Sequence, residues 1–347
     1  MQRSRLTNNY SISKIIKGGW QLAGGHGQIN SDQAIADMFD YYDAGITTFD
    51  CADIYTGVEE LIGKFLGQLR AQRGISEANK VQVHTKYVPD LQTLSTLTAS
   101  DVERVILRSM RRLEVERLDL VQFHWWDFSI QRYVEVALML SDLQKKGLIR
   151  HIGLTNFDPV HIQELKEAGV NPIVNQVQYS ALDRRPEKSL QAFCAKNEMT
   201  MLCYGSLAGG LMSDQYLAKS EPSKEAMSAN RSLIKYKLII DELGGWAQFQ
   251  RLLRKLHKIG ASRSLSISEI AMLYVLSKPD VGAVIVGARN SQHVSSIPKL
   301  AQQNLSHGEI AEIERTLHQA SLQGDVYGLE RTNEKHKGIM KYNLNKE

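Results

Sequence analysis

Short apolar runs recur along the chain, each followed by a polar turn and then by a longer segment with helical spacing. Eight of these runs are candidates for strands: 14–19, 46–50, 81–86, 118–124, 150–155, 172–178, 201–205 and 282–287. Most are apolar through their middle, as expected of parallel strands that are buried on both faces. The pattern therefore predicts strands that alternate with helices around one parallel sheet.

Between these runs, apolar residues recur three and four positions apart, which is typical of helices packed on a core. Two segments show the spacing clearly, one through Ile35, Met38, Phe39 and Tyr42 and the other through Val102, Val105, Ile106, Met110 and Leu113. We expect the second helix to begin at a capping box of Ser100 and Glu103. Ser266 and Glu269 form another such pair farther along the chain.

Eight strand–helix units over 347 residues predict a (β/α)8 TIM barrel, with an N-terminal hairpin as its cap and the whole chain, 1–347, as a single domain. The alternative is a doubly wound sheet, whose dinucleotide-binding version carries G-x-G-x-x-G after its first strand. Here the first strand is followed by "GGWQLAGGHGQ", which lacks that spacing. Trp20 also stands where the backbone would have to approach a pyrophosphate, so we favour the barrel.

Two segments depart from the regular pattern. The stretch 208–266 is a long, mostly polar insertion before the last unit. It either lies on the surface or folds over a ligand at the carboxyl ends of the strands. The tail 332–347 is expected to be mostly mobile, although a tail near a barrel mouth can shape a pocket.

Composition narrows the class of protein. The chain is 43% hydrophobic and 23% charged, with a net charge of +4 from 42 basic and 38 acidic side chains and no long Lys/Arg block. These values fit a globular protein and argue against a dedicated nucleic-acid binder. Three cysteines without C-x-x-C spacing, Cys51, Cys194 and Cys203, fit a reducing compartment. With neither a signal peptide nor a run of the ~20 apolar residues that span a bilayer, we expect a cytoplasmic protein without a membrane partner.

Ionisable side chains gather where three consecutive strands are predicted to end. Asp50 ends the second strand and Tyr55 follows it, Lys86 ends the third strand, and His124 ends the fourth. Each residue alone has an ordinary explanation, such as a helix cap, a solvated ammonium or a packed ring. Because active sites of barrels lie at the carboxyl ends of the strands, their joint placement favours a catalytic set.

These four residue types suit proton transfer to a reacting carbonyl. A tyrosine can protonate a developing alkoxide, but its ordinary pKa is about 10. An ammonium within ~4 Å contributes about 4 kcal/mol at an effective dielectric constant near 20, roughly three pKa units before desolvation opposes it. An aspartate can orient that ammonium, and a neutral imidazole can donate to the substrate oxygen. None of them transfers two electrons, so a redox cofactor is required.

Here the chain resembles a known family, the aldo-keto reductases. The segments "GITTFDCADIYTG", "VHTKY", "VQFHW", "IGLTNF" and "VNQVQYS" are similar to the family's successive signatures, in the same order, and the resemblance extends from Lys14 to about Ala320. It implies an NAD(P)H-dependent oxidoreductase that interconverts carbonyl and alcohol groups. It also implies that Tyr55 is the proton donor, that Lys86 and Asp50 tune it, and that His124 orients the carbonyl.

The resemblance further implies NADPH as the cofactor, with NADH as the alternative, bound across the barrel mouth. If the insertion 208–266 folds over a ligand, we expect that ligand to be the cofactor. Its family positions for the nicotinamide end are Thr155, Asn156, Gln176 and the stacking ring of Tyr204. Those for the phosphates are Ser206, Leu207, Gly287 and Arg289, with Arg289 suited to a 2′-phosphate.

The chain departs from the family's pattern at two places. Gly205 and Ser206 replace its usual Ser-Pro, and Ser296-Ile297 stand where it often has Glu-Asn for adenine. The second departure leaves the choice between NADPH and NADH open.

Aromatic residues near the strand ends suggest the kind of substrate. Trp20, Tyr87 and Trp125 are predicted to line a pocket for a small-molecule carbonyl substrate with an apolar or aromatic body, with Trp126 and Phe128 close by. Packing at the rim is the alternative for each ring. Asp53 is expected to help in the loop outside the catalytic set, and Cys51 to point away from Asp50 into packing.

Other functions remain open on the sequence alone. The chain could be a cofactor-sensing auxiliary or binding subunit with slow turnover, or a Schiff-base lyase with Lys86 as nucleophile. A metal hydrolase using Asp50, His84 and His124 ranks last, because it lacks an H-x-H pair and because we expect His84 to face away from Lys86. We therefore expect no metal, and we find no sequence signal for a protein partner.

Overall fold

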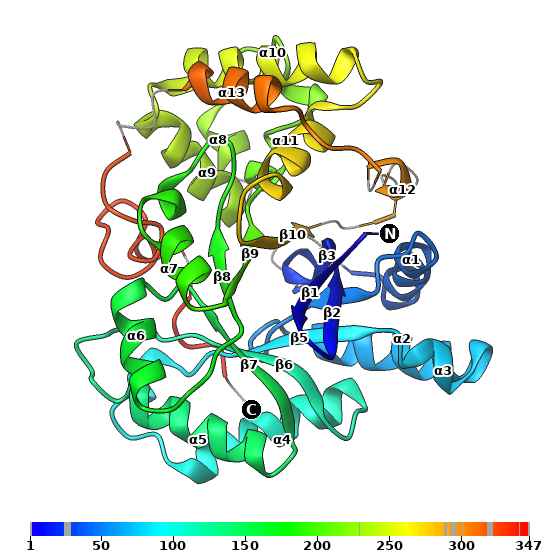
Figure 1. The fold of residues 1–347 in the computed structure, drawn as a ribbon, viewed down its shortest axis with the longest axis vertical. Coiled ribbons are helices and arrows are strands. Elements are labelled where there is room, and N and C mark those ends of the chain that lie inside the picture. The colour runs from blue at the N-terminus through cyan, green and yellow to red at the C-terminus, as the bar shows by residue number, and fades with distance from the viewer. Residues whose placement is uncertain are drawn as a thin grey trace.

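Eight parallel strands close into a barrel in the computed structural model of the chain (Figure 1). The structure describes residues 2–23, 29–228, 230–287, 290–291, 294, 297–300, 302–317, 322–339 and 341–345. The barrel strands are β3 (Ile15–Gly18), β4 (Thr48–Asp50), β5 (Gln82–Tyr87), β6 (Leu118–Phe123), β7 (Ile149–Thr155), β8 (Val174–Gln178), β9 (Thr200–Tyr204) and β10 (Val281–Gly287). All eight predicted runs are barrel strands.

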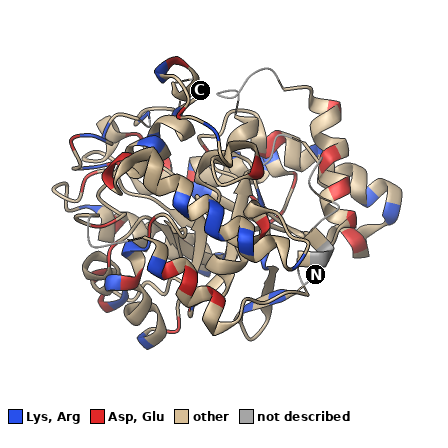
Figure 2. Cartoon of the chain, turned by 90° about the horizontal axis from the view of Figure 1, so that it is seen from above, with Lys and Arg blue, Asp and Glu red and all other residues tan. Residues whose placement is uncertain are grey.

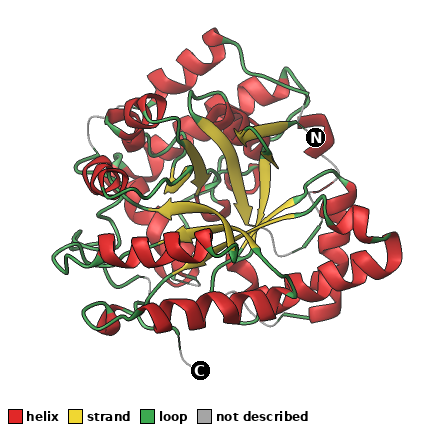
Figure 3. Ribbon diagram, turned by 60° about the horizontal axis from the view of Figure 1, so that its bottom comes forward, coloured by secondary structure: helices red, strands yellow, loops and turns green. Residues whose placement is uncertain are grey.

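The barrel closes because its last strand pairs with its first. β10 lies parallel to β3, with Val284 opposite Ile15, and parallel to β9 on its other side. A doubly wound sheet would leave two open edges, so this pairing rules out that alternative and confirms the (β/α)8 barrel. Figure 3 shows the strands in the middle of the molecule with helices around them.

The N-terminal hairpin closes the amino-terminal end of the barrel. Its antiparallel strands are β1 (Arg3–Thr7) and β2 (Tyr10–Ser13). Leu6, Tyr10 and Ile12 of the hairpin pack in one cluster with residues from the interior of the barrel, including Ile16 and Leu120. The predicted cap is thus present, and it covers the amino-terminal end of the barrel.

Helices cover the outside of the barrel and follow the strands in chain order. They are α1 (Ser31–Asp43), α2 (Val58–Arg73), α3 (Ile75–Ala78), α4 (Ala99–Leu113), α5 (Tyr133–Lys145), α6 (Pro159–Glu167), α7 (Leu190–Lys196), α8 (Lys224–Met227), α9 (Arg231–Glu242), α10 (Gly245–Ala261), α11 (Ile267–Leu276), α12 (Ile297–Leu300) and α13 (His307–Thr316). None in the described part of the chain is long and apolar enough to cross a bilayer.

One of the two predicted capping boxes is wrong. Helix α4 begins two residues earlier than expected, and its box is formed by Thr98 and Asp101, so Ser100 lies inside the first turn. The box of Ser266 and Glu269 at the start of α11 is confirmed. At α4, Thr98 with Asp101 and Ser100 with Glu103 both fit the S/T-x-x-acid pattern, so the pattern alone did not show which residue begins the helix.

The insertion 208–266 forms helices α8, α9 and α10. Its basic stretch lies on α10, beside the acidic helix α13, as Figure 2 shows from above. Lys255 of α10 pairs with Glu312, and Arg263 just beyond α10 pairs with Glu309. Part of this basic charge is therefore matched within the chain.

The C-terminal tail packs on the barrel instead of leaving it. The carbonyl of Tyr342 accepts a hydrogen bond from the Leu91 amide, and its ring meets Trp126 edge-on at 4.9 Å. Asn345 donates to the carbonyl of Val88 at 2.6 Å. The described part of the tail thus contacts Trp126, which lines the cavity at the barrel mouth.

Candidate active site

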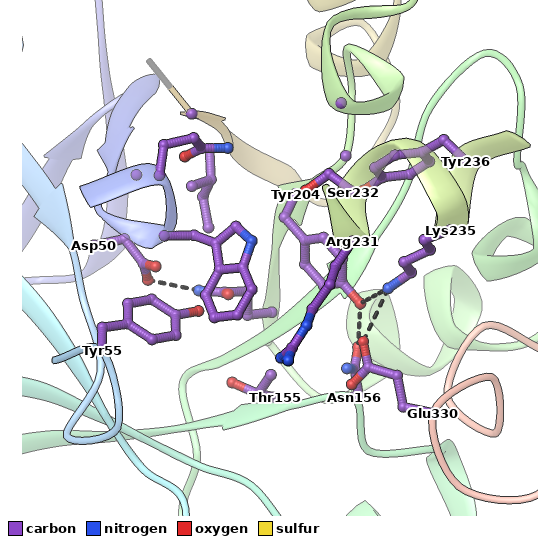
Figure 4. A pocket seen from close by; sticks show the side chains of 18 of the residues that line it. Asp50, Tyr55, Thr155, Asn156, Tyr204, Arg231, Ser232, Lys235, Tyr236 and Glu330 are labelled. Carbon is purple, nitrogen blue, oxygen red and sulfur yellow. Dashed lines mark hydrogen bonds and ion pairs between the residues drawn. The ribbon is translucent and has the colours of Figure 1, made fainter. Parts of the chain in front are cut away.

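The four predicted catalytic residues line one cavity at the carboxyl ends of the strands. Asp50 ends β4, Tyr55 lies in the following loop, Lys86 lies in β5, and His124 directly follows β6. The cavity has a volume of about 410 Å³. Figure 4 shows Asp50 and Tyr55 on one side of it, facing Tyr204 and Asn156. The barrel's parallel register brings three neighbouring strand ends together, as the sequence predicted.

Lys86 and Asp50 form a buried ion pair. Lys86 Nζ lies 2.6 Å from Asp50 Oδ1, and both side chains are only 4% exposed. The ammonium also donates to the Cys51 carbonyl at 2.7 Å. Oxygen Oδ2 of Asp50 accepts from Gln122 at 3.0 Å and from Gln176 at 2.7 Å. Because both charges have further hydrogen-bond partners, the pair can stay ionised in the interior.

Gln122 is a member of the site that the sequence reading missed. It lies on β6 two residues before His124, so strand alternation places both on the inward face. Its Oε1 accepts from Gln176 at 2.8 Å, which links the two amides that hold Asp50. The available signal was a polar residue two positions before His124, on the same face of the strand.

Lys86 remains positively charged beside Tyr55. Burial opposes its charge, but Asp50 and Tyr55 outweigh burial, and the pKa of Lys86 is raised. Its ammonium lies 4.8 Å from the centre of the Tyr55 ring. Burial raises the pKa of Tyr55 to about 12, and the positive charge of Lys86 opposes that rise. The sequence argument expected the ammonium to lower the pKa, whereas desolvation outweighs it here.

His124 is a neutral imidazole. Burial, aided by the charge of Arg331, lowers its pKa to about 3. Its Nδ1 lies 3.2 Å from the Thr155 carbonyl, and its Nε2 is buried without a partner in the described part of the chain. A neutral ring carries one proton, so the tautomer that donates to Thr155 leaves Nε2 as an acceptor, and the other tautomer leaves it as a donor.

The predicted cofactor residues that the structure describes also line this cavity: Thr155, Asn156, Gln176, Tyr204, Ser206, Leu207 and Gly287. Arg289, together with Ser296, lies outside the described residues. Gly205 departs from the family's usual serine for a physical reason. Its φ is +76°, and a Cβ there would overlap the ring of Tyr236 from α9. The glycine therefore lets the insertion approach the end of β9.

The polar lining of the cavity suits a dinucleotide, which itself carries many polar groups. Several buried polar atoms around it have no partner among the described residues, including Thr155 Oγ1, Ser206 Oγ and Gln21 Oε1. Buried polar atoms normally have partners, so these are available to a ligand. Thr155 ends β7 and Ser206 follows β9, at the two places expected to hold the nicotinamide and the pyrophosphate.

The predicted aromatic pocket requires a correction. Trp20 lines the cavity and meets Tyr55 edge-on at 5.1 Å. Tyr87 and Trp125 are not among the lining residues. Tyr87 alternates outward from Lys86 and stacks on Phe123, while Trp125 is fully buried and donates to the carbonyls of Asp127 and Ile130. Trp126 lines the cavity instead.

Two predictions about side-chain direction have different outcomes. Cys51 is fully buried in the apolar core, as expected. His84, expected to face away from Lys86, lies on the same inward face, where its Nε2 is 3.0 Å from the Tyr10 hydroxyl of the hairpin.

Asp53 accepts from the Val88 amide and is buried, so it supports the loop after β5. Within the described residues, no group of three potential ligands is placed to hold a metal.

Helix α9 and the C-terminal segment supply site residues that the sequence reading did not identify. Arg231, Lys235 and Glu330 line the cavity, and Lys235 pairs with Glu330 at 2.9 Å. Lys235 and Glu330 are 95 positions apart in the chain, so no local sequence pattern indicated this contact. The insertion therefore contributes directly to the cavity wall.

A barrel with this tetrad and a cavity for a dinucleotide defines the class of redox enzymes that act on carbonyl groups. Comparison with known proteins agrees. The family model described as "Aldo/keto reductase family" matches residues 14–318, so the chain belongs to the aldo/keto reductase family. It is an NAD(P)H-dependent oxidoreductase of carbonyl and alcohol groups, as the sequence resemblance implied.

Individual relatives are distant but cover most of the chain. The chain is 24% identical over 321 residues to the NADH-specific methylglyoxal reductase of Escherichia coli (strain K12), covering 87% of this chain and 94% of that protein. It is 28% identical over 302 residues to the chloroplastic pyridoxal reductase of Arabidopsis thaliana, covering 82% and 77%.

Solved structures show the same fold. A glycerol dehydrogenase from Gluconobacter oxydans superposes with a TM-score of 0.75 at 22% identity, covering 90% of this chain and 94% of that one. An aldo/keto reductase from Klebsiella pneumoniae in complex with NADP and acetate gives a TM-score of 0.68 at 21% identity, with the same coverage.

Proposed function

We propose that this protein reduces a small aldehyde or ketone to the alcohol, or runs the reverse reaction, with Tyr55 as the proton donor. The observation that carries the proposal is the buried Asp50–Lys86 pair beside Tyr55, in the cavity that also holds His124. A tyrosine held protonated next to a fixed ammonium is suited to give its proton to a developing alkoxide.

The chain's own residues have distinct roles in this proposal. Tyr55 protonates the substrate oxygen, and Lys86 stabilises the phenolate that this transfer leaves. Asp50, held by Gln122 and Gln176, keeps Lys86 in place. His124 faces the substrate oxygen through Nε2. Donation to a bound carbonyl requires the proton on that nitrogen, and this tautomer gives up the hydrogen bond from Nδ1 to the Thr155 carbonyl.

The cofactor is NADPH or NADH, which supplies the hydride when bound. We assign the nicotinamide end to Thr155, Asn156 and Tyr204, and the pyrophosphate to Ser206 and Leu207. Partnerless buried oxygens on Thr155 and Ser206 support this assignment. Gln176 already donates to Asp50 and Gln122, so we assign it to the catalytic ion pair as well as to the carboxamide.

The substrate is a small-molecule carbonyl with an apolar or aromatic body. Trp20, Trp126 and Ile54 give the cavity apolar walls near Tyr55. The relatives named for methylglyoxal and pyridoxal act on small aldehydes, which agrees in size with a cavity of about 410 Å³ shared with the nicotinamide. All three cysteines are free and buried, which supports our proposal of a reducing, cytoplasmic compartment.

Cofactor consumption by the purified protein tests this function. We expect oxidation of NADPH with methylglyoxal, pyridoxal or an activated aromatic aldehyde, with NADH run in parallel to settle the preference. Cofactor binding without turnover on any of these carbonyls would instead favour the cofactor-sensing role. Absence of cofactor binding would contradict the proposal altogether.

A further inference from the structure

Asn156 has a left-handed backbone conformation, which asparagine adopts more readily than most other residues and which contacts on two sides hold in place here. Its φ is +55°, in the left-handed region, although it is not a glycine. A residue other than glycine keeps this conformation in a functional site when neighbouring contacts fix it. Its amide donates to the Gln176 carbonyl at 2.9 Å, which accounts for one contact only.

Arg331 of the C-terminal segment holds the Asn156 backbone from the other side. Its Nη1 donates to the Asn156 carbonyl at 2.7 Å, and its Nε donates to the Trp125 carbonyl at 2.8 Å. The guanidinium also lies 4.7 Å from the centre of the Phe128 ring. Arg331 thus joins the loop after β7 to the loop that carries His124 and Trp126.

Glu330, the preceding residue, reaches the side chain of Asn156 through two intermediates. Glu330 pairs with Lys235 at 2.9 Å, Lys235 Nζ lies 3.4 Å from the Tyr204 hydroxyl, and that hydroxyl donates to Asn156 Oδ1 at 3.1 Å. Figure 4 shows these contacts. Burial opposes both charges, but their attraction outweighs it, so the pKa of Glu330 is lowered and that of Lys235 is raised.

These contacts fix which way the Asn156 amide faces. Because Oδ1 accepts from Tyr204, the amide group Nδ2 remains a donor, and it has no hydrogen-bond partner in the part of the chain that the structure describes. Asn156 lines the cavity. The group it offers a ligand is therefore an N–H donor, which matches the carbonyl oxygen of a carboxamide.

We propose that Glu330 and Arg331 are positioning residues that hold Asn156 in place to bind the nicotinamide carboxamide. The inference rests on the proposed cofactor role of Asn156. Arg331 fixes its backbone, and Glu330 fixes its side chain through Lys235 and Tyr204. The C-terminal segment is then a component of the nicotinamide site, although neither residue touches the dinucleotide in this account.

Two ligands separate this role from a general structural one. NADPH contains the nicotinamide, and 2′-phosphoadenosine 5′-diphosphoribose is the same molecule without it; NADH and ADP-ribose replace them if wild type prefers NADH. We expect Arg331→Met to weaken NADPH binding about tenfold, as loss of a supporting contact behind a ligand-binding group typically does. Binding of the fragment should stay within about twofold, since it makes no contact with Asn156.

The matched control is Lys335→Met, which removes an exposed cation from the same segment. It should leave both dissociation constants unchanged. Arg331→Lys, which keeps the charge and one donor, should recover part of the loss. Glu330→Gln weakens the contacts that hold the Asn156 side chain, so it should also weaken NADPH binding and spare the fragment. This variant keeps the proposal testable if Arg331→Met fails to fold.

A double-mutant cycle tests the route through Asn156. In an Asn156→Ala background, Arg331→Met should add no further loss of NADPH affinity, because the group it positions is already absent. Equal weakening of NADPH and the fragment, or no weakening of either, would overturn the inference. If wild type binds neither ligand, the proposed function fails first and the inference falls with it.

Discussion

Gln176 donates a hydrogen bond to Asp50 across 2.7 Å and so joins β8 to β4 through the interior of the barrel. The two residues are 126 positions apart in the chain. Together with Gln122, Gln176 supplies the neutral donors that let the Asp50 carboxylate stay buried and ionised beside Lys86. The Asp50–Lys86 ion pair is thus held by a network that spans the barrel rather than by a single contact.

Replacing Gln122 should lower the rate more than the stability. In Gln122→Met, Asp50 loses one of its two amide donors while the side-chain volume is kept. We expect kcat to fall roughly tenfold, about the effect of one charge-assisted hydrogen bond, with Tm within a few degrees of wild type. Steady-state kinetics and thermal unfolding measure the two effects.

Gln178→Met is the matched control for that variant. Gln178 is also a buried glutamine inside the barrel, but it donates to Asp183 and not to Asp50. Its replacement should change Tm by a similar amount and leave kcat near wild type. Equal losses of kcat in the two variants would show that the network around Asp50 has no special role.

The two adjacent tryptophans should behave differently when each is replaced by phenylalanine. Trp125→Phe loses hydrogen bonds to the carbonyls of Asp127 and Ile130, so we expect the free energy of unfolding to fall by about 1–3 kcal/mol with KM unchanged. Trp126→Phe keeps most of its bulk, and its Nε1 has no partner in the described structure. Its KM for aromatic aldehydes should rise severalfold with little loss of stability. The opposite pattern would restore Trp125 to the pocket.

Stability should fall in acid because of His84. Burial lowers the pKa of His84 to about 3, so the folded protein holds a neutral ring, whereas the unfolded chain takes up a proton near pH 6.5. The stabilisation is complete above pH 6.5 and is lost as the pH falls toward 3, by about 1.4 kcal/mol per pH unit.

His84→Gln tests that dependence, since glutamine can still accept from the Tyr10 hydroxyl. Urea midpoints measured between pH 7 and 4 should decline less steeply in this variant than in wild type. His307→Gln, at an exposed position, is the control and should keep the slope of wild type. Identical slopes in all three proteins would contradict the account of His84.

The features that depend on strand alternation and strand order, which are the barrel and the grouping of site residues at the strand ends, could be predicted from the sequence. Asp50, Lys86 and His124 could be placed together because they end three successive apolar runs, and the closed barrel follows from eight such runs. Side-chain directions in the loops after the strands could not be predicted in this way. Trp125 and Trp126 are neighbours in "FHWWD", and the pattern of residues does not show which ring turns into the cavity.

Contacts between distant segments were not predictable from local pattern. Lys235 and Glu330 lie in an insertion and in a C-terminal segment, and each looks like an ordinary surface charge in the sequence. Arg331 likewise gave no signal, because its partners are backbone carbonyls, which have no identity in a sequence. The net pKa of Tyr55 could not be predicted, because the burial that opposes Lys86 is not readable from the sequence.

The most direct test of the central claim is the rate of NADPH oxidation by Tyr55→Phe, measured beside its affinity for NADPH. Burial raises the pKa of Tyr55 to about 12, so the phenol is protonated throughout the neutral range and able to donate. Removing it should lower kcat by about 10²- to 10⁴-fold, while the dissociation constant for NADPH changes little. A Tyr55→Phe enzyme that turns over as fast as wild type would contradict the assignment of the proton donor.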